Sequence, residues 1–325
     1  MSHIGLRIVL ALCTTLSLTQ GVACAQQSYP SRPLRIVIPF PPGGTLDIFT
    51  RAFGARLTEL TGQQVIVDNR SGGLTVIASE IVARANPDGY TIGIMGSGHA
   101  VNPYVFKSLP YDTDKDFQPV SLAIKVPGLM TAHPALPANT IGEIIALAKA
   151  SPGKYNYATP GSLTSGHLSM ELIKLTAGID ITTIPYKGGG PAIIDLIGGQ
   201  VQMLISGAPG VLPHIKSGKL KAIGVTDSKR TPGLPDIPTL AETGLPGFAT
   251  YDWYGLFVPA RTPPEVVARL QQMLAQILRQ QDFSERLTVL GAEPVGGSPE
   301  EFRKFIRSEM DRWGTLARKI GLKAD

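Results

Sequence analysis

Cysteine is nearly absent from this sequence. Its 325 residues include two cysteines, Cys13 and Cys24, and both lie within the first 25 residues. That segment has a weakly basic start, a mostly apolar run from Ile8 to Leu18 and a small-residue cleavage pattern ending at Ala25, which together predict a signal peptide over residues 1–25. Its removal would leave no thiol, and therefore neither a disulfide bond nor a thiolate metal site.

Long hydrophobic runs are also missing. The apolar run of the leader is too short to span a bilayer, and the rest of the chain has no further transmembrane segment. A lipoprotein signal would acylate Cys24, but Gly21 occupies the position where such signals prefer leucine. We therefore expect a chain that is exported to the periplasm and released by cleavage.

Charge of one sign does not accumulate. The formal net charge is +5, from 30 basic and 25 acidic residues, with no block of Lys or Arg. Such a balance favours anionic ligands weakly and is not typical of nucleic-acid binding. The histidines are scattered, and the HExxH, GxSxG and GxxxxGK motifs are absent, so we expect no metal, no cofactor and no enzyme activity. His167 is expected to bond to backbone at a helix start.

The stretch from residue 36 to residue 51 carries the strongest local signal. The β-branched run Ile36–Ile38 predicts a buried strand, which the prolines at 39, 41 and 42 terminate. Gly43 and Gly44 permit a sharp turn, and a helix is expected from Asp47, as N-cap, to a C′ glycine at Gly62. The loop N–H groups and the helix start would suit a carboxylate or phosphate, although a plain strand-to-helix turn explains the pattern too.

The same theme of strand, small-residue loop and helix repeats along the chain. Further strands are expected near residues 64–68, 90–95, 118–132, 155–158, 181–185, 201–205, 219–226 and 253–258. Helices are expected near residues 74–85, with Ile77 facing inward, and near residues 140–150, 168–177 and 191–197 and through the C-terminal third. Residues 99–118 are expected to be irregular or to form short helical turns. This alternation predicts an α/β fold of two lobes, each with a mostly parallel sheet flanked by helices. We place lobe 1 at residues 26–127 plus 252–325 and lobe 2 at residues 128–251.

Several segments of this sequence resemble the Bug-type receptors, the extracytoplasmic solute-binding components of tripartite tricarboxylate transporters. They are Tyr29-Pro-Ser-Arg-Pro-Leu, Pro42-Gly-Gly, Val67-Asp-Asn-Arg, Asn86-Pro-Asp-Gly-Tyr-Thr, Leu109-Pro-Tyr-Asp, Gly166-His-Leu, Pro185-Tyr-Lys-Gly-Gly, Asp195-Leu-Ile-Gly-Gly-Gln-Val and Trp253-Tyr-Gly-Leu. The resemblance covers the whole mature chain in order. It implies a type II-like periplasmic binding protein with a ligand cleft between the lobes, which delivers a small carboxylate to membrane permease subunits. We expect it to act as a monomer and to bind no nucleic acid.

The resemblance also implies binding residues. The family grips one carboxylate through the loop after the first strand, which here corresponds to Gly43, Gly44, Thr45 and Asp47. The hydroxyl groups of Ser162, Thr164 and Ser165 are candidates for another polar end of the ligand. The remaining candidates in the small-residue loops are Ser97 and Ser206, together with Leu46.

This chain departs from the family pattern at the predicted cleft. Leu46, Leu74 and Val76 stand where the family has glycine, alanine or polar residues, and Ser206 stands where it often has Asp. An apolar cleft rim would favour a mono- or dicarboxylate with an aromatic or long aliphatic body over citrate. Drift at positions that never touch ligand is the alternative explanation. A receptor that presents its ligand to a sensor kinase, and an exported enzyme on the same scaffold, remain as alternative functions.

Overall fold

The computed structural model describes residues 29–289 and 291–324. Met1–Ser31 and Arg32–Asp325 are separate units, and the fold below is that of the second. The predicted signal peptide at residues 1–25 lies outside the described residues.

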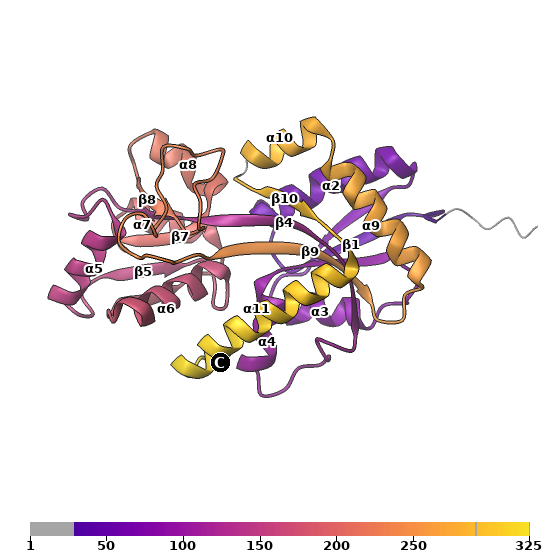
Figure 1. Ribbon diagram of the computed structural model, residues 1–325, viewed down its shortest axis with the longest axis horizontal. Helices are drawn as coiled ribbons and strands as arrows, with labels where there is room; N and C mark the ends of the chain where they lie inside the picture. The colour runs from indigo at the N-terminus through magenta and orange to yellow at the C-terminus, as the bar shows by residue number, and fades with distance from the viewer. Residues whose placement is uncertain (1–28, 290, 325) are drawn as a thin grey trace, which may run out of the picture. The chain divides into compact units, whose positions relative to one another are not determined.

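Strands and helices alternate along the chain, as expected of an α/β protein (Figure 1). The strands are β1 (Leu34–Ile38), β2 (Val65–Asn69), β3 (Thr91–Met95), β4 (Phe117–Ala132), β5 (Asn156–Thr159), β6 (Thr182–Pro185), β7 (Met203–Gly207), β8 (Lys221–Val225), β9 (Tyr251–Pro259) and β10 (Glu293–Gly296). The helices are α2 (Thr45–Thr61), α3 (Val76–Ala83), α4 (Ser97–Val105), α5 (Ile141–Ala150), α6 (Ser165–Ala177), α7 (Gly189–Ile197), α8 (Ala208–Lys216), α9 (Pro264–Leu278), α10 (Gln281–Val289) and α11 (Pro299–Ile320). A short 3₁₀ turn, η1 (Gly73–Thr75), precedes α3.

Within the described residues, the strands form one mixed sheet in the order β2-β1-β3-β9-β4-β7-β5-β6, with β8 and β10 also paired to β4. Two groups of strands in it are parallel. The first strand group joins β1 to β2 and β3, and the second joins β5 to β6 and β7. The long strands β4 and β9 lie between the groups and run antiparallel to their neighbours. The α/β prediction is confirmed, and the antiparallel crossings make the sheet mixed.

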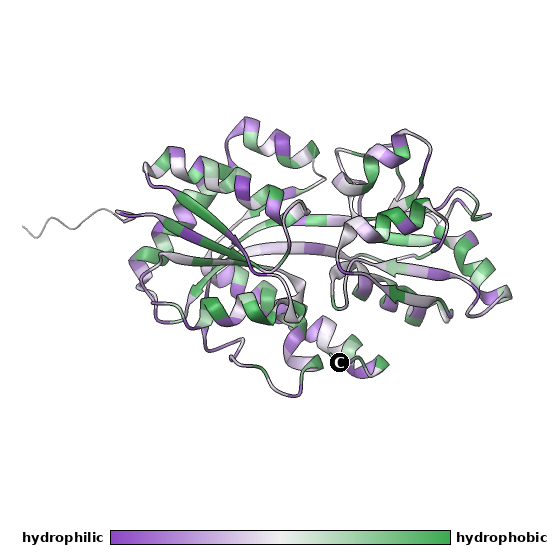
Figure 2. Cartoon of the chain, turned by 180° about the vertical axis from the view of Figure 1, so that it is seen from behind, coloured by the Kyte–Doolittle hydropathy of each residue, from purple (hydrophilic) through white to green (hydrophobic). Residues whose placement is uncertain are grey.

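Helices cover both faces of each strand group (Figure 1). Beside the second group, α5 and α6 pack on one face through a core that includes Ile144, Met170 and Met203. On the other face α7 and α8 pack through a core that includes Leu196 and Leu204. Neighbouring residues of β7 thus serve opposite cores, as the alternation of a strand requires. Figure 2 shows the same arrangement as hydrophobic strands and helix faces turned inward, with hydrophilic faces outward.

The strand β4 passes from one strand group to the other. Its pairing with β9 runs from Phe117 to Pro127, and its pairing with β7 begins at Gly128. The predicted lobe boundaries at residues 127/128 and 251/252 stay a prediction, because pairing alone does not define a domain.

The helix α11 packs on α4, and its Phe302, Ile306 and Met310 join a core with Trp253 and Phe257 of β9. Farther along it, Trp313 and Leu316 share another core with α4 and with Leu168 of α6. The C-terminal helix therefore contacts elements beside both strand groups.

Local structure differs from expectation in several places. Residues 97–105 form the helix α4 in spite of Gly98 and Pro103, and it covers the start of the region expected to be irregular or to form short helical turns. The helix α8 and strand β10 were not expected, because α8 contains Gly210 and Pro213 and β10 is only a short addition to β4. Ile77, expected to face inward, is 45% exposed.

Candidate functional site

The loop after β1 leads into an open helix start. Gly44 is the N-cap of α2, with φ −80° and ψ 169°, and no side chain caps the helix. Gly43 has a φ of +91°, a conformation that glycine adopts without strain. No heavy atom lies within 4 Å of where a Cβ would stand at either glycine. The first turn of α2 therefore turns its N–H groups and the positive end of its dipole toward open space.

Asp47 does not cap this helix, because the N-cap is Gly44, three residues earlier than predicted. Its side chain is buried, and the carboxylate accepts hydrogen bonds from Gly43 N at 3.0 Å and Arg51 Nε at 3.0 Å. Asn69 Nδ2 donates a further one at 2.9 Å. Burial acts to raise the pKa of Asp47, but hydrogen bonds from Arg51, Gly43 and Asn69 and the charge of Arg51 together hold it below its usual value. Asp47 thus fixes the shape of the loop, with its charge balanced by Arg51.

The start of α2 meets the start of α8. A Cβ at Gly207 would stand 2.7 Å from Thr45 Oγ1, so the Thr45 side chain lies close against the backbone of Gly207. Gly207 is the N-cap of α8, which also lacks a side-chain cap. The neighbouring Ser206 lies within β7 and not in a loop, and its buried Oγ has no hydrogen-bond partner among the described residues. Thr45 therefore lies beside Gly207, the residue that follows Ser206, and the binding role of both residues stays a prediction.

In the loop before α6, the hydroxyl group of Thr164 forms hydrogen bonds within the loop and the helix start. Thr164 caps α6: its Oγ1 accepts from His167 N at 3.4 Å and donates to Gly161 O at 2.8 Å. His167 Nδ1 accepts from Leu163 N at 3.1 Å, which confirms its expected role at a helix start. Ser162 is exposed at the tip of the turn. Of the three predicted hydroxyl residues, Thr164 is thus engaged in structure.

Ser97 and Ser165 meet at a residue that sequence reasoning missed, Asp252 of β9. Ser97 Oγ donates to Asp252 Oδ1 at 3.0 Å, and Tyr254 Oη donates to Oδ2 at 2.7 Å. Burial raises the pKa of the Asp252 carboxyl, against hydrogen bonds from the hydroxyls of Tyr254, Ser97 and Ser165 and from Trp253 N–H that act to lower it. The first residues of α4 and α6 are thereby tied to one carboxyl group.

Strained backbone conformations occur in the turn before α3 and in the loop before α6. Among the described non-glycine residues, positive φ occurs at Leu74 (52°), Thr75 (78°) and Leu163 (62°). Leu163 precedes the N-cap of α6, and Leu74 and Thr75 lead into α3. A Cβ at Gly98 would lie 3.1 Å from Thr75 Oγ1, so the start of α4 touches this strained turn. Strain of this kind costs about 1–3 kcal/mol per residue and typically marks functional loops.

The apolar substitutions at the predicted cleft rim have packing partners. Leu46 is only 2% exposed. Leu74 packs against the core shared by α4, α6 and α11, and Val76 packs against the core of the first strand group. Their side chains thus contribute to cores, whether or not a ligand also contacts them.

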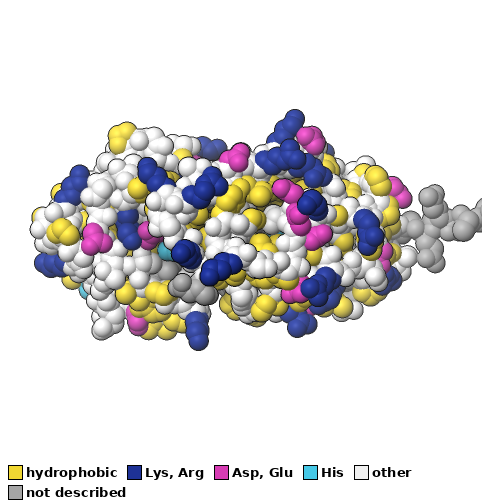
Figure 3. Space-filling model, turned by 90° about the horizontal axis from the view of Figure 1, so that it is seen from below, with side chains coloured by type: hydrophobic (Ala, Val, Ile, Leu, Met, Phe, Trp, Pro, Cys, Tyr) yellow, Lys and Arg dark blue, Asp and Glu magenta, His cyan; other side chains and the backbone are white. Residues whose placement is uncertain are grey.

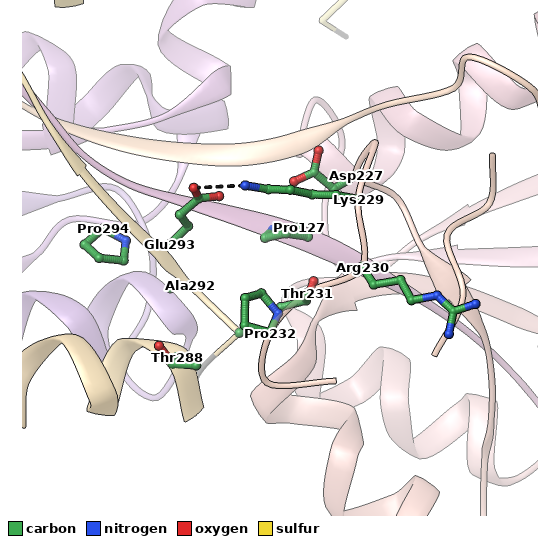
Figure 4. Close-up of a pocket in the computed structure, with 11 residues that line it drawn as sticks. Pro127, Asp227, Lys229, Arg230, Thr231, Pro232, Thr288, Ala292, Glu293 and Pro294 are labelled. Carbon is green, nitrogen blue, oxygen red and sulfur yellow. Dashed lines mark hydrogen bonds and ion pairs between the residues drawn. The ribbon is translucent and has the colours of Figure 1, made fainter. Parts of the chain in front are cut away.

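A cavity of about 140 Å³ is lined by other residues (Figure 4). Its walls come from Pro127 of β4, from Asp227 and residues 229–232, and from Thr288 and residues 291–294. Lys229 Nζ and Glu293 Oε1 pair across it at 3.3 Å, and the buried Oγ1 of Thr231 has no hydrogen-bond partner among the described residues. Its walls contain none of the predicted binding residues, although a Cβ at Gly291 would stand 3.3 Å from Cβ of Ala208, the first residue of α8.

The described residues contain no group of three or more His, Cys, Asp or Glu side chains able to hold a metal ion. Lys and Arg side chains are scattered among acidic and hydrophobic ones on the face shown in Figure 3, without a continuous basic surface. No helix within the described part of the chain has the length and apolar character needed to cross a membrane.

Known proteins resemble this chain over most of its length. The family model described as "Tripartite tricarboxylate transporter family receptor" matches residues 49–322. A Rhodopseudomonas palustris protein, Rpa4515, solved with adipate, is 37% identical, with a TM-score of 0.86 over 91% of this chain and 99% of that one. The periplasmic binding protein BugD is 35% identical, with a TM-score of 0.83 over 91% and 100% of the two chains. MatC from R. palustris, solved with malate, is 32% identical, with a TM-score of 0.81 over 89% and 99%.

These similarities agree with the order of motifs in the sequence and with the arrangement of strands around β4 and β9. The fold is the two-lobe α/β fold of the Bug-type binding proteins. The chain belongs to the tripartite tricarboxylate transporter receptor family.

Proposed function

We propose that this chain is a periplasmic receptor that captures a small organic carboxylate and delivers it to the membrane subunits of a tripartite tricarboxylate transporter. One observation carries the proposal: the N-cap of α2, Gly44, has no side-chain cap, and the space over it is open. Backbone N–H groups and a helix dipole at such a place form an anion site. The adipate and malate in the solved relatives support a carboxylate as the anion.

The ligand we propose is a carboxylate with a hydrophobic body. Leu46, Leu74 and Val76 make the predicted cleft rim more apolar, because the family pattern has glycine or polar residues at these positions. A hydroxyl-rich ligand such as citrate would leave polar groups without partners there, at a cost of about 1–3 kcal/mol for each. Competition between citrate, malate and an aromatic carboxylate tests this, and tight binding of citrate or malate with none of the aromatic would contradict it.

A thermal-shift screen of small carboxylates tests the receptor function. A ligand present at about 100 times its Kd stabilises the folded state by roughly 2.7 kcal/mol. The Gly44→Val variant should lose this stabilisation, because a β-branched side chain would fill the open space over the helix start.

The matched control is Gly198→Val at the C-cap of α7. Its φ is −75°, and a Cβ there would meet ordinary contacts at 3.5 and 3.7 Å. The control variant should bind as the parent does. Unchanged affinity of Gly44→Val in calorimetry would remove this loop from the site.

Delivery to a transporter is tested by uptake of the identified ligand in cells that lack the permease subunits. Loss of uptake supports delivery. Retained uptake together with a ligand-dependent transcriptional response would favour presentation to a sensor kinase, and turnover of the ligand by the purified protein would favour an enzyme. Mass spectrometry of the exported protein should find Gln26 as its first residue, since we place the cleavage after Ala25.

A further inference from the structure

Pairing between the long strands β4 and β9 stops at a defined place. The last pair of this ladder is Pro127 with Tyr251. Proline has no N–H group to donate, so the ladder loses a donor here. The next partners along the two strands would be Gly128 and Thr250. The backbones of both residues bond instead to a third residue, Thr226.

Thr226 forms hydrogen bonds with Gly128 on one side and with Thr250 on the other. Its N–H donates to Gly128 O at 2.8 Å, and its Oγ1 accepts from Gly128 N at 2.9 Å. The same Oγ1 donates to Thr250 O at 2.7 Å, and Thr226 O accepts from Thr250 N at 2.8 Å. A hydroxyl group can donate and accept at once, so one side chain serves both strands. Thr226 therefore lies between the two crossings and joins them.

The residues around this junction are closely packed. Thr226 is 1% exposed, and Thr250 is fully buried. A Cβ at Gly128 would stand 2.7 Å from Cγ2 of Ile205 and 3.0 Å from Oγ1 of Thr226, so the junction requires glycine at this position. Without the hydroxyl group of Thr226, the N–H of Gly128 and the C=O of Thr250 would lose this partner in a place that water does not reach, which is unfavourable.

Hydrogen bonds continue from Thr250 to the start of α6. Thr250 Oγ1 and Ser169 Oγ are 2.7 Å apart, and Ser169 Oγ donates to Ser165 O at 2.7 Å. Because Ser169 has a single hydroxyl hydrogen, Thr250 is the donor of the first pair. Ser165 is the first residue of α6 and one of the predicted binding residues. The crossings are therefore linked by hydrogen bonds to a predicted binding residue.

We propose that Thr226 is a positioning residue for ligand capture, which joins β4 to β9 at the predicted lobe boundary and makes the two crossings bend as one unit. Domain closure is usually confined to a few residues at the ends of elements, and Thr226 occupies such a position. Two crossings that are not joined would bend independently, and more of the molecules would then have their lobes arranged unsuitably for closure. This inference rests on the proposed receptor function and adds a residue to it that does not contact the ligand.

Thr226→Val tests the inference, because valine has nearly the shape of threonine but lacks the hydroxyl group. The probe for calorimetry is adipate, with which the Rpa4515 structure was solved. The dissociation constant should rise roughly tenfold, since apparent affinity falls with the fraction of molecules in the binding-competent arrangement. Thr226→Ser keeps the hydroxyl group and should restore the affinity of the parent protein.

Thr231→Val is the matched control. Thr231 is 7% exposed and lies in the same connection between β8 and β9, but its Oγ1 has no hydrogen-bond partner among the described residues. The control thus loses a buried hydroxyl group without losing a hydrogen bond, and it should bind adipate as the parent does. Thermal unfolding of each variant separates stability from affinity. A merely structural role of Thr226 would lower the melting temperature and leave the dissociation constant unchanged.

A second measurement needs no ligand. Both native cysteines lie within the predicted signal peptide, so Lys216→Cys on α8 and Glu285→Cys on α10 would supply the only thiols of the exported protein. Both positions are exposed and accept spin labels. Double electron–electron resonance then gives the distribution of distances between the labels. Thr226→Val should broaden this distribution relative to the parent, and Thr231→Val should not.

An unchanged dissociation constant and an unchanged distance distribution in Thr226→Val would overturn the inference and leave the receptor function standing. Thr226→Ala replaces Thr226→Val if the latter melts below the working temperature, and the same results are expected of it. Failure of the parent protein to bind adipate or any other carboxylate in the screen would count against the receptor function itself. The distance distributions would still decide whether Thr226 makes the crossings bend as one unit.

Discussion

The His99 side chain is enclosed by aromatic rings. Its ring centroid lies 4.7 Å from that of Phe117, 4.8 Å from that of Phe257 and 6.2 Å from that of Tyr111. Neither ring nitrogen has a hydrogen-bond partner among the described residues. A histidine in such surroundings stays neutral, because protonation would place an unpaired charge in an apolar site.

This enclosure predicts a loss of stability in acid. Burial lowers the pKa of His99 from 6.5 to about 3. Below pH 6.5, His99 therefore binds a proton in the unfolded chain but stays neutral in the folded chain. The free energy of unfolding should thus fall by about 1.4 kcal/mol between pH 7.5 and pH 5.5 through this residue alone. Urea unfolding of the parent and of His99→Phe at both pH values measures the effect. Identical pH dependence in the two proteins would show that His99 does not titrate this way.

Features of the candidate site that depend on neighbouring residues could be predicted from the sequence. Features that depend on contacts between residues far apart in the sequence could not. Three prolines followed by Gly43 and Gly44 forbid a strand and require a turn, so the position of the loop could be predicted. Asp47 was misassigned because a short acidic residue near a helix start has the pattern of a cap, while its actual partners include Asn69. Asp252 could not be found, because its partner Ser97 is 155 residues away.

At the scale of elements, α11 packs closely on β9. Gly255 of β9 lies beneath the ring of Phe302, and a methyl group added at Gly255 would overlap that ring. Trp253 also packs edge-on against Phe302, with ring centroids 5.8 Å apart. The contact leaves room for glycine alone.

Gly255→Ala is therefore expected to destabilise the fold by roughly 1–3 kcal/mol through overpacking. Chemical unfolding measures the loss, and Gly198→Ala serves as the control because its added methyl group meets only ordinary contacts. The double variant Gly255→Ala with Phe302→Leu should recover part of the loss, since the smaller side chain makes room. Wild-type stability of Gly255→Ala would show that α11 shifts away at no cost.

Most elements could be predicted because their signals lie within a few residues. The capping boxes at Thr140–Glu143 and Ser298–Glu301 are present at the starts of α5 and α11. By contrast, α8 is a helix in spite of its Gly210 and Pro213, because packing of Ala208 and Val211 on β7 outweighs weak intrinsic propensity. The mixed character of the sheet also depends on β9 entering between β3 and β4, which no local pattern indicates.

At the scale of the whole molecule, the crossings β4 and β9 are the expected hinge between the two lobes. A ligand that is held at the start of α2 and also contacts the second lobe should draw the lobes together. Small-angle scattering should then give a smaller radius of gyration with saturating ligand, and Gly44→Val should show no such change at the same concentration. An unchanged radius for the parent protein with bound ligand would indicate a structure that is closed beforehand.

The insertion of β9 between β3 and β4 has a consequence for biosynthesis. The strands β1, β2 and β3 are synthesised first. The strand β9, which pairs with β3, and the covering helix α11 are synthesised near the end of translation. The second strand group, by contrast, comes from one continuous stretch. Until translation is almost complete, the first group has an unpaired edge and an uncovered apolar face, which are features that chaperones bind. The order of the strands thus predicts that the first group completes its folding only when the last helix has been made.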